Sequence, residues 1–137
     1  MKKYIKAMAI INPQLCNNIS IQVEVEQRDE GPIPHMHVYH NKTRNPKECS
    51  YIRLDAPEYS THHKDNIPLS NKLKKEFIQV MTQPWQKHII AVPSGYRPAT
   101  GYEAAVDIWV DTFEKGDYSK FNLDADGNVI PIDYSKL

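Results

Sequence analysis

Apolar and polar residues alternate strictly near the start of the chain, in residues 19–27, ISIQVEVEQ. The apolar positions of this run are Ile19, Ile21, Val23 and Val25. A period of two predicts an antiparallel strand with one face on the core and the other face in water. Shorter apolar or alternating runs predict further strands at residues 3–11, 35–40, 49–55 and 87–92.

Two later segments have the period of an amphipathic helix instead. The first begins at the N-cap Ser70 and is stopped by Pro84. Its apolar stripe consists of Leu73, Phe77, Val80 and Met81. The second begins with a capping box, Thr100 and Glu103, and is expected to run to about Lys115 before Gly116 ends it.

The segments between these elements contain the residues typical of turns and loops. Residues 56–68 lack a period and carry two prolines, and residues 93–101, PSGYRPATG, are also expected to form a loop. Near the C-terminus, two short apolar runs flank Asp-Gly-Asn in residues 121–132, which predicts a hairpin with Pro131 on an edge strand.

These elements together predict one α+β domain over residues 1–137. Its antiparallel sheet would have four or more strands packed by one or two helices, with a C-terminal helix and hairpin as an extension. The alternative division is a core of residues 1–92 and an extension of residues 93–137. Four aromatic residues are expected to anchor the core or an interface: Phe77, Trp85, Trp109 and Phe113.

Composition and charge narrow the environment and the function classes. No run approaches the roughly 18 apolar residues that span a bilayer, and Lys6 interrupts the only N-terminal apolar stretch, so a cytoplasmic protein is expected. The two cysteines, Cys16 and Cys49, fit a reducing compartment. Seventeen basic residues balance seventeen acidic ones, which argues against a dedicated, sequence-tolerant nucleic-acid binder. The charge is uneven, because residues 101–137 hold eight acidic side chains against three basic ones.

Histidines dominate the candidate chemistry, and three of the six lie in residues 35–40, HMHVYH. If Met36 and Val38 face the core, His35 and His37 lie together on the opposite face and His40 leaves the group. The pair supplies two of the ligands that a zinc-like ion needs. The others could come from His62 or His63, or from Asp55 or Glu58 at the end of the neighbouring strand. The alternative is a pair of ordinary sheet residues that hydrogen-bond to neighbours such as Tyr39 or Glu58.

Other signatures of catalysis are absent from the sequence. No nucleophile elbow, Walker loop or His-Glu-x-x-His motif occurs, and only five glycines are available for phosphate-binding loops. No cofactor is therefore expected, with a divalent metal as the alternative. Nucleic-acid binding is a further alternative, because Tyr51 and Tyr59 are interleaved with basic residues at Arg44, Lys47, Arg53, Lys64, Lys72, Lys74 and Lys75.

A resemblance to a known family rests on the motif Pro34-His35-Met36-His37-Val38 and on the order of the elements after it. These are the segment CSYIRLD, a polar loop and a Lys-rich helix ending near Trp85. Over residues 19–85 the chain resembles a small bacterial family of unknown function with a Pro-His-x-His-Val strand, whose members often lie in toxin–antitoxin-like or mobile-element neighbourhoods. This chain departs from the family by a longer loop with His62 and His63 and by about fifty extra C-terminal residues. The resemblance implies a compact module that acts by binding.

Two functions are therefore expected from the sequence. The first is a non-enzymatic protein-binding module from a bacterial mobile-element or phage setting, acting as an antitoxin-like or inhibitor protein, with a homo-oligomer as a further expectation. Its binding residues would be Tyr39, Tyr51, Arg53, Glu58 and Tyr59. The alternative is a metal-dependent hydrolase or nuclease that uses His35, His37 and one of His62 or His63.

Overall fold

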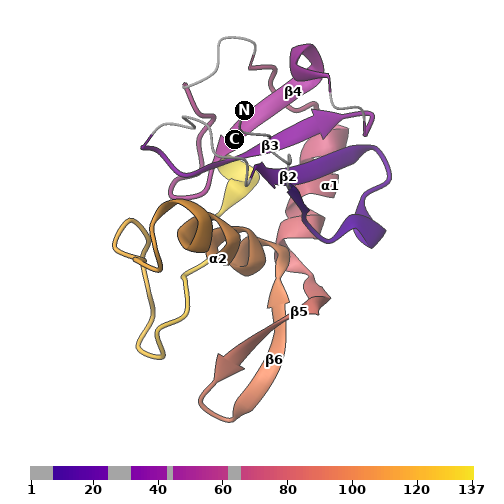
Figure 1. Ribbon diagram of the computed structural model, residues 1–137. Helices are drawn as coiled ribbons and strands as arrows, with labels where there is room; N and C mark the ends of the chain where they lie inside the picture. Colours follow the sequence, from indigo (N-terminus) through magenta and orange to yellow (C-terminus); the bar gives the residue numbers. More distant parts are fainter. Residues whose placement is uncertain (1–7, 25–31, 43–44, 62–65) are drawn as a thin grey trace, which may run out of the picture.

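The computed structural model describes residues 8–24, 32–42, 45–61 and 66–137. Four antiparallel strands form the sheet at the top of Figure 1, in the order β1-β2-β3-β4. Their bounds are β1 (Met8–Ile10), β2 (Ile19–Glu24), β3 (His35–His40) and β4 (Cys49–Arg53). Short 3₁₀ turns, η1 (Pro13–Leu15) and η2 (Pro46–Glu48), precede β2 and β4. The predicted α+β class and four-stranded antiparallel sheet are confirmed.

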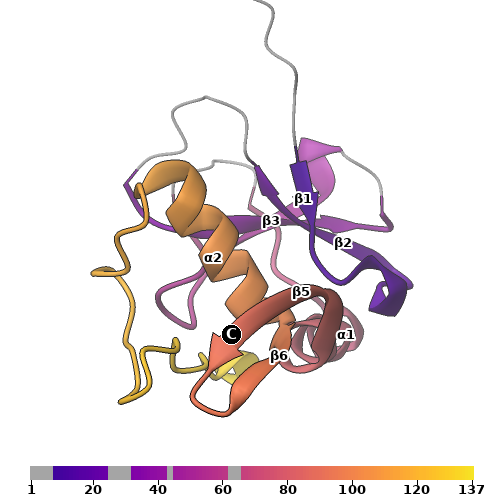
Figure 2. The same ribbon diagram turned by 60° about the horizontal axis from the view of Figure 1, so that its bottom comes forward.

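One face of this sheet packs on two helices, α1 (Asn71–Thr82) and α2 (Gly101–Phe113). Both helices lie on the same side of the sheet in Figures 1 and 2. The register aligns Ile21 with Val38, and both belong to one buried apolar cluster with Phe77 of α1 and Trp109 of α2. Burial of this shared apolar surface is the main force that holds the sheet on the helices.

The helix boundaries follow the predicted capping residues. Ser70 Oγ accepts the amide of Leu73, and Thr100 and Glu103 form a complete capping box. At the far end of α2, the amide of Gly116 donates to Val110 O, and its φ of 84° suits a glycine. Both predicted helices are thus confirmed, and each ends within about two residues of its predicted end.

A separate hairpin, β5 (Pro84–Val92) and β6 (Gly95–Thr100), projects from the helices at the bottom of Figure 1. The prediction of a loop over residues 93–101 is wrong, because residues 95–100 form β6. Its two prolines favoured a loop in the sequence, but Pro93 lies in the turn, and Pro98 lies on an edge strand that tolerates proline. The predicted strand at residues 87–92 is also longer, since β5 begins at Pro84.

The C-terminal segment after α2 runs beside the hairpin and returns to the core. The hairpin predicted in residues 121–132 is reduced to one bridge between Leu123 and Val129. The chain ends in η3 (Tyr134–Lys136), where buried Tyr134 donates its hydroxyl to Arg53 O at 2.5 Å. No helix in the described ranges combines the length and apolar character needed to cross a membrane.

Candidate functional site

The second face of the sheet carries the predicted histidines, and it is buried. The sequence predicts that Ser20, Gln22 and Glu24 of β2 face water, but their exposed fractions are 8%, 2% and 6%. That prediction is wrong because alternation in the sequence cannot distinguish a solvated polar face from a polar face covered by the rest of the chain. His35 and His37 are likewise only 1% and 7% exposed.

The buried polar residues of this face contact one another. The rings of His35 and His37 stack with centroids 5.3 Å apart, which confirms that both lie on one face, and Tyr51 packs edge-on to His37 at 4.9 Å. The Tyr39 hydroxyl donates to Glu24 Oε1 at 3.4 Å and lies 3.3 Å from His37 Nδ1. Buried polar groups joined in this way fix strand register.

The predicted metal site cannot be assembled from these residues alone. His62 and His63 lie outside the described residues, so the prediction that they join His35 and His37 stays a prediction. Among the residues that the structure does describe, no group of three or more His, Cys, Asp or Glu side chains converges on a point that could hold a metal ion. His40 faces away from the pair, and its Nε2 lies 2.8 Å from Ser50 Oγ.

The remaining predicted binding residues make contacts that support the loop after β4. Arg53 forms a two-point ion pair with Asp55, at 2.8 and 2.9 Å, and its amide donates to Glu58 O. The Tyr59 hydroxyl accepts the Leu69 amide at 2.8 Å. Tyr39 and Tyr51 are buried. Partner binding by Tyr39, Tyr51, Arg53, Glu58 and Tyr59 stays a prediction.

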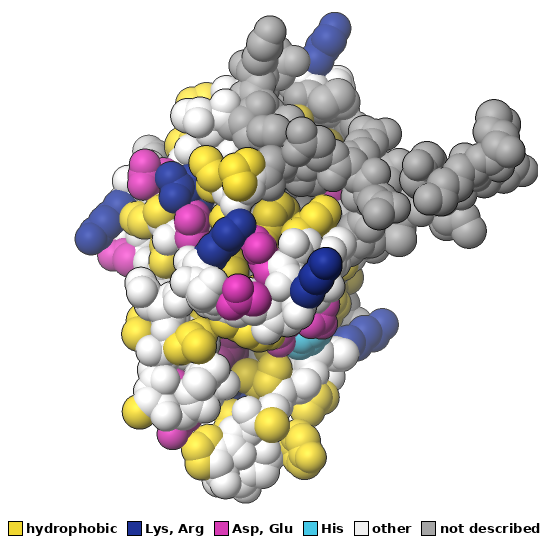
Figure 3. Space-filling view, turned by 60° about the vertical axis from the view of Figure 1, so that its left-hand side comes forward, with side chains coloured by type: hydrophobic (Ala, Val, Ile, Leu, Met, Phe, Trp, Pro, Cys, Tyr) yellow, Lys and Arg dark blue, Asp and Glu magenta, His cyan; other side chains and the backbone are white. Residues whose placement is uncertain are grey.

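Among the described residues, the two most exposed large hydrophobic side chains lie instead on the hairpin, which is not among the sites predicted from the sequence. The register aligns Ile89 with Pro98 and Ala91 with Tyr96, so these four side chains share one face, which we call the hairpin face. Tyr96 is 81% exposed and Ile89 is 54% exposed. Figure 3 shows hydrophobic and uncharged side chains at the lower end of the molecule, where the hairpin lies.

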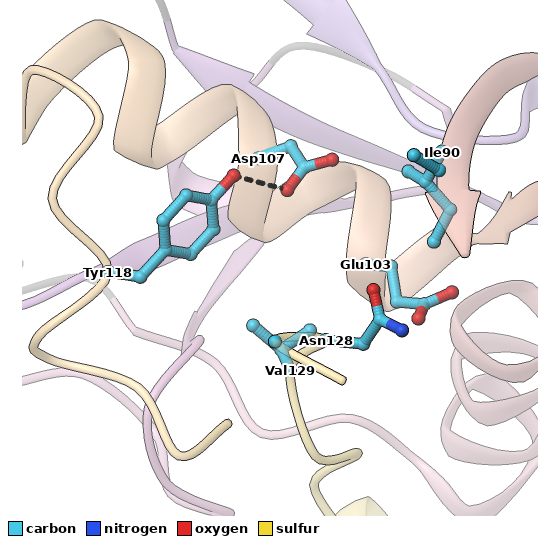
Figure 4. A pocket seen from close by; sticks show the side chains of 8 residues that line it. Ile90, Glu103, Asp107, Tyr118, Asn128 and Val129 are labelled. Atoms are coloured by element: carbon cyan, nitrogen blue, oxygen red, sulfur yellow. Dashed lines mark hydrogen bonds between the residues drawn. The ribbon is translucent and has the colours of Figure 1, made fainter. Parts of the chain in front are cut away.

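A groove separates β5 from the C-terminal segment and has a volume of about 280 Å³. Ile90 and Ala91 line it on the β5 side, and residues 127–129 line it on the other side. Glu103, Asp107 and Tyr118 complete its lining (Figure 4). The volume lies just below the range of about 300–1,000 Å³ that is usual for small-molecule sites, so the groove suits one or two side chains of a larger ligand.

The polar side chains of this groove also fasten the hairpin to α2. His88 Nε2 lies 3.1 Å from Asp107 Oδ2, and the Tyr118 hydroxyl donates to Asp107 Oδ1 at 2.7 Å. Burial and the Asp107 hydrogen bond raise the pKa of Tyr118, so the phenol stays a donor at neutral pH. An irregularity between Trp85 and Ile89 changes the strand register and interrupts the regular pairing around His88.

An ion pair joins the next strand, β6, to the same helix. Arg97 of β6 donates two hydrogen bonds to the Glu103 carboxylate, each 2.8 Å long. Burial opposes ionisation of Glu103, but the hydrogen bonds from Arg97 and from Thr100 outweigh it and lower the pKa of the carboxyl. Glu103 is therefore a carboxylate at neutral pH, and it both caps α2 and orients Arg97.

Comparisons with known proteins give no further assignment: no family model, no curated protein and no solved structure matches this chain.

Proposed function

We propose that this protein is a non-enzymatic protein-binding module whose contact surface is the hairpin face of β5 and β6. The observation that carries the proposal is the exposure of Tyr96 and Ile89 on a hairpin that projects from the body of the molecule. Tyrosine and other large apolar side chains of this kind are the anchors of protein interfaces.

The construction of the hairpin supports this proposal. A two-stranded hairpin is only marginally stable by itself, and apolar side chains on its outer face add nothing to folding while they remain in water. In this chain, contacts from Arg97 and His88 to α2 hold the inner face, whereas the outer face has no charged residue at its four positions. A protein partner that covers the hairpin face would bury the surface that folding leaves exposed.

The resemblance of residues 19–85 to a family from toxin–antitoxin-like neighbourhoods supports a more specific role. We propose that the bound partner is a bacterial or phage protein whose activity this chain blocks, as an antitoxin or an inhibitor does. In that role the chain needs only a rigid fold and a contact surface, and the buried histidine face supplies rigidity rather than chemistry.

Capture of the partner by matched variants tests the proposal. The wild-type chain, the double variant Ile89→Ser/Tyr96→Ser and the control Ile10→Ser are each immobilised and exposed to a lysate of the source organism. Ile10 is 41% exposed on β1, so its substitution removes exposed apolar surface away from the hairpin. We expect the wild type and the control to retain the same protein in a near-equimolar ratio and the double variant to lose it.

Two outcomes would contradict the proposal: retention of that protein by the double variant, or no equimolar protein on the wild type. The activity of the retained protein, measured with and without this chain, then tests the inhibitor role. An unchanged activity would leave binding intact but refute inhibition.

A further inference from the structure

We infer that the outer edge of β5 receives an extended, basic segment of the partner as an added strand, with its side chains in the groove beside α2. This inference rests on the proposed function and names the partner's chemistry. Strand addition of this kind obtains affinity from main-chain hydrogen bonds and specificity from the pockets that receive alternate side chains.

The turn of the hairpin determines which backbone groups face outward. Val92 pairs with Gly95 across the two-residue turn Pro93–Ser94, so they form a hydrogen-bonded pair. Hydrogen-bonded and non-hydrogen-bonded pairs alternate along an antiparallel ladder, so Ile89 and Ala91 direct their amides and carbonyls away from β6. In the described part of the chain, no other backbone group bonds to the outer edge of β5.

The two outer edges of the hairpin are not equivalent. On β6, Pro98 occupies an outward position and has no amide hydrogen, which blocks the addition of a strand there. On β5, the outward positions Ile89 and Ala91 keep their donors. The β5 edge also borders the groove, which Ile90 and Ala91 line, so an added strand would have space for its side chains.

The charge around the groove selects the kind of segment. Glu103 and Asp107 line it, the charge of Asp111 acts on Tyr118, and the charge of Asp124 acts on Arg97. Arg97 is paired with Glu103, and Asp107 is bonded to His88 and Tyr118. Among the described residues, no lysine or arginine forms an ion pair with Asp107, Asp111 or Asp124. Lysine or arginine side chains on the inner face of an added strand would complement this charge.

A fluorescein-labelled peptide of about seven residues, alternating threonine and lysine, tests the inference by fluorescence anisotropy. The matched peptides replace lysine with glutamate, or carry N-methyl groups on the backbone amides that would face β5. We expect the lysine peptide to bind the wild type at least about tenfold more tightly than either matched peptide. Equal affinity for the N-methylated peptide, equal affinity for the glutamate peptide or no binding would overturn the inference.

Variants of the receiving edge give an independent result. Ala91→Pro removes one outward donor without removing a bond to β6, and Ala91→Val keeps the donor and favours the strand. We expect Ala91→Pro, but not Ala91→Val, to weaken the lysine peptide and the captured partner by about tenfold or more. Because the N-methylated peptide is tested on the wild-type chain, the inference stays falsifiable even where Ala91→Pro disturbs the hairpin.

The outcomes also separate this inference from the proposed function. Loss of the partner from Ile89→Ser/Tyr96→Ser with full retention by Ala91→Pro would refute strand addition and leave the hairpin face as the binding surface. Retention by both variants would refute the two together. A wild-type dimer in light scattering that Ala91→Pro abolishes would assign the edge to a second copy of the chain and overturn the inference.

Discussion

His88 and Asp107 connect the hairpin to the second helix, because His88 Nε2 of β5 lies 3.1 Å from Asp107 Oδ2 of α2. Both side chains are about one-quarter exposed, at 26% and 25%. An interaction of this exposure contributes at most about 1 kcal/mol. Its importance is geometric: it holds β5 at the position where its outer edge borders the groove.

Replacement of His88 by leucine tests this connection. We expect His88→Leu to speed hydrogen exchange at the amides of Ile90 and Val92, since the hairpin then opens more often. The change in opening free energy should be no more than about 1 kcal/mol, and the Tm of the whole protein should change little. Lys87→Leu, one residue away and exposed, is the control, and equal exchange rates in the two variants would contradict the connection.

Gly101 of α2 lies directly against the backbone of α1 at Val80 and Met81. A Cβ on this glycine would overlap the carbonyl oxygen of Val80, which is backbone and cannot rotate away. We expect Gly101→Ala to lower the free energy of unfolding by about 1–3 kcal/mol, as overpacking does elsewhere. Urea unfolding measures it, with the exposed α2 substitution Thr112→Ala as a control that should stay within about 0.5 kcal/mol of the wild type. If Gly101→Ala were as stable as the wild type, the two helices would be able to move apart without loss of stability, which would contradict close packing at this glycine.

Glu76 of α1 gives stability a dependence on pH. Burial opposes its ionisation, but bonds from the amides of Asn17, Asn18 and Ile19 and from the Asn18 side chain outweigh that cost and lower its pKa. A carboxyl whose pKa is lower in the folded state stabilises the fold above its unfolded value of about 4.3 and loses this effect as the pH falls through the folded value.

We therefore expect Glu76→Ala to be about 1–3 kcal/mol less stable than the wild type at pH 7, since several charge-assisted hydrogen bonds are lost. The difference should shrink as the pH falls below about 4.3. Urea unfolding of both proteins between neutral and acidic pH measures it. A difference that stays constant down to the lowest pH would show that the charge of Glu76 does not contribute.

The two cysteines are buried free thiols in the folded chain. Burial raises the pKa of Cys49 to about 12, and burial also raises the pKa of Cys16. A thiolate is the reactive form, so we expect both cysteines to resist a thiol reagent at pH 8 until denaturant unfolds the protein, when two thiols should react. Fast stoichiometric labelling of the native protein would contradict this.

Local sequence patterns, such as capping residues and apolar periodicity, predicted more of the fold than of the candidate site. Ser70, Thr100 and Glu103 are local capping signals, so both helices could be located, and the alternation around Ile21 located β2. The burial of Ser20, Gln22 and Glu24 is a property of the folded chain, which no local period records. Pro98 and Gly95 are typical loop residues, so they favoured a loop prediction. Only the pairing with β5 shows that Pro98 takes an outward edge position and that Gly95 lies beside the turn. The candidate site was missed for the same reason.

Hydrogen exchange on the complex tests the central claim, that the hairpin is the binding surface, most directly. The chain is compared alone and bound to its captured partner, and the amides of Ile89 and Ala91 are followed at residue resolution. If the hairpin is the binding surface, both amides gain strong protection while those of the β2–β3 ladder stay unchanged. Protection confined to the four-stranded sheet, with no change at Ile89 and Ala91, would contradict it.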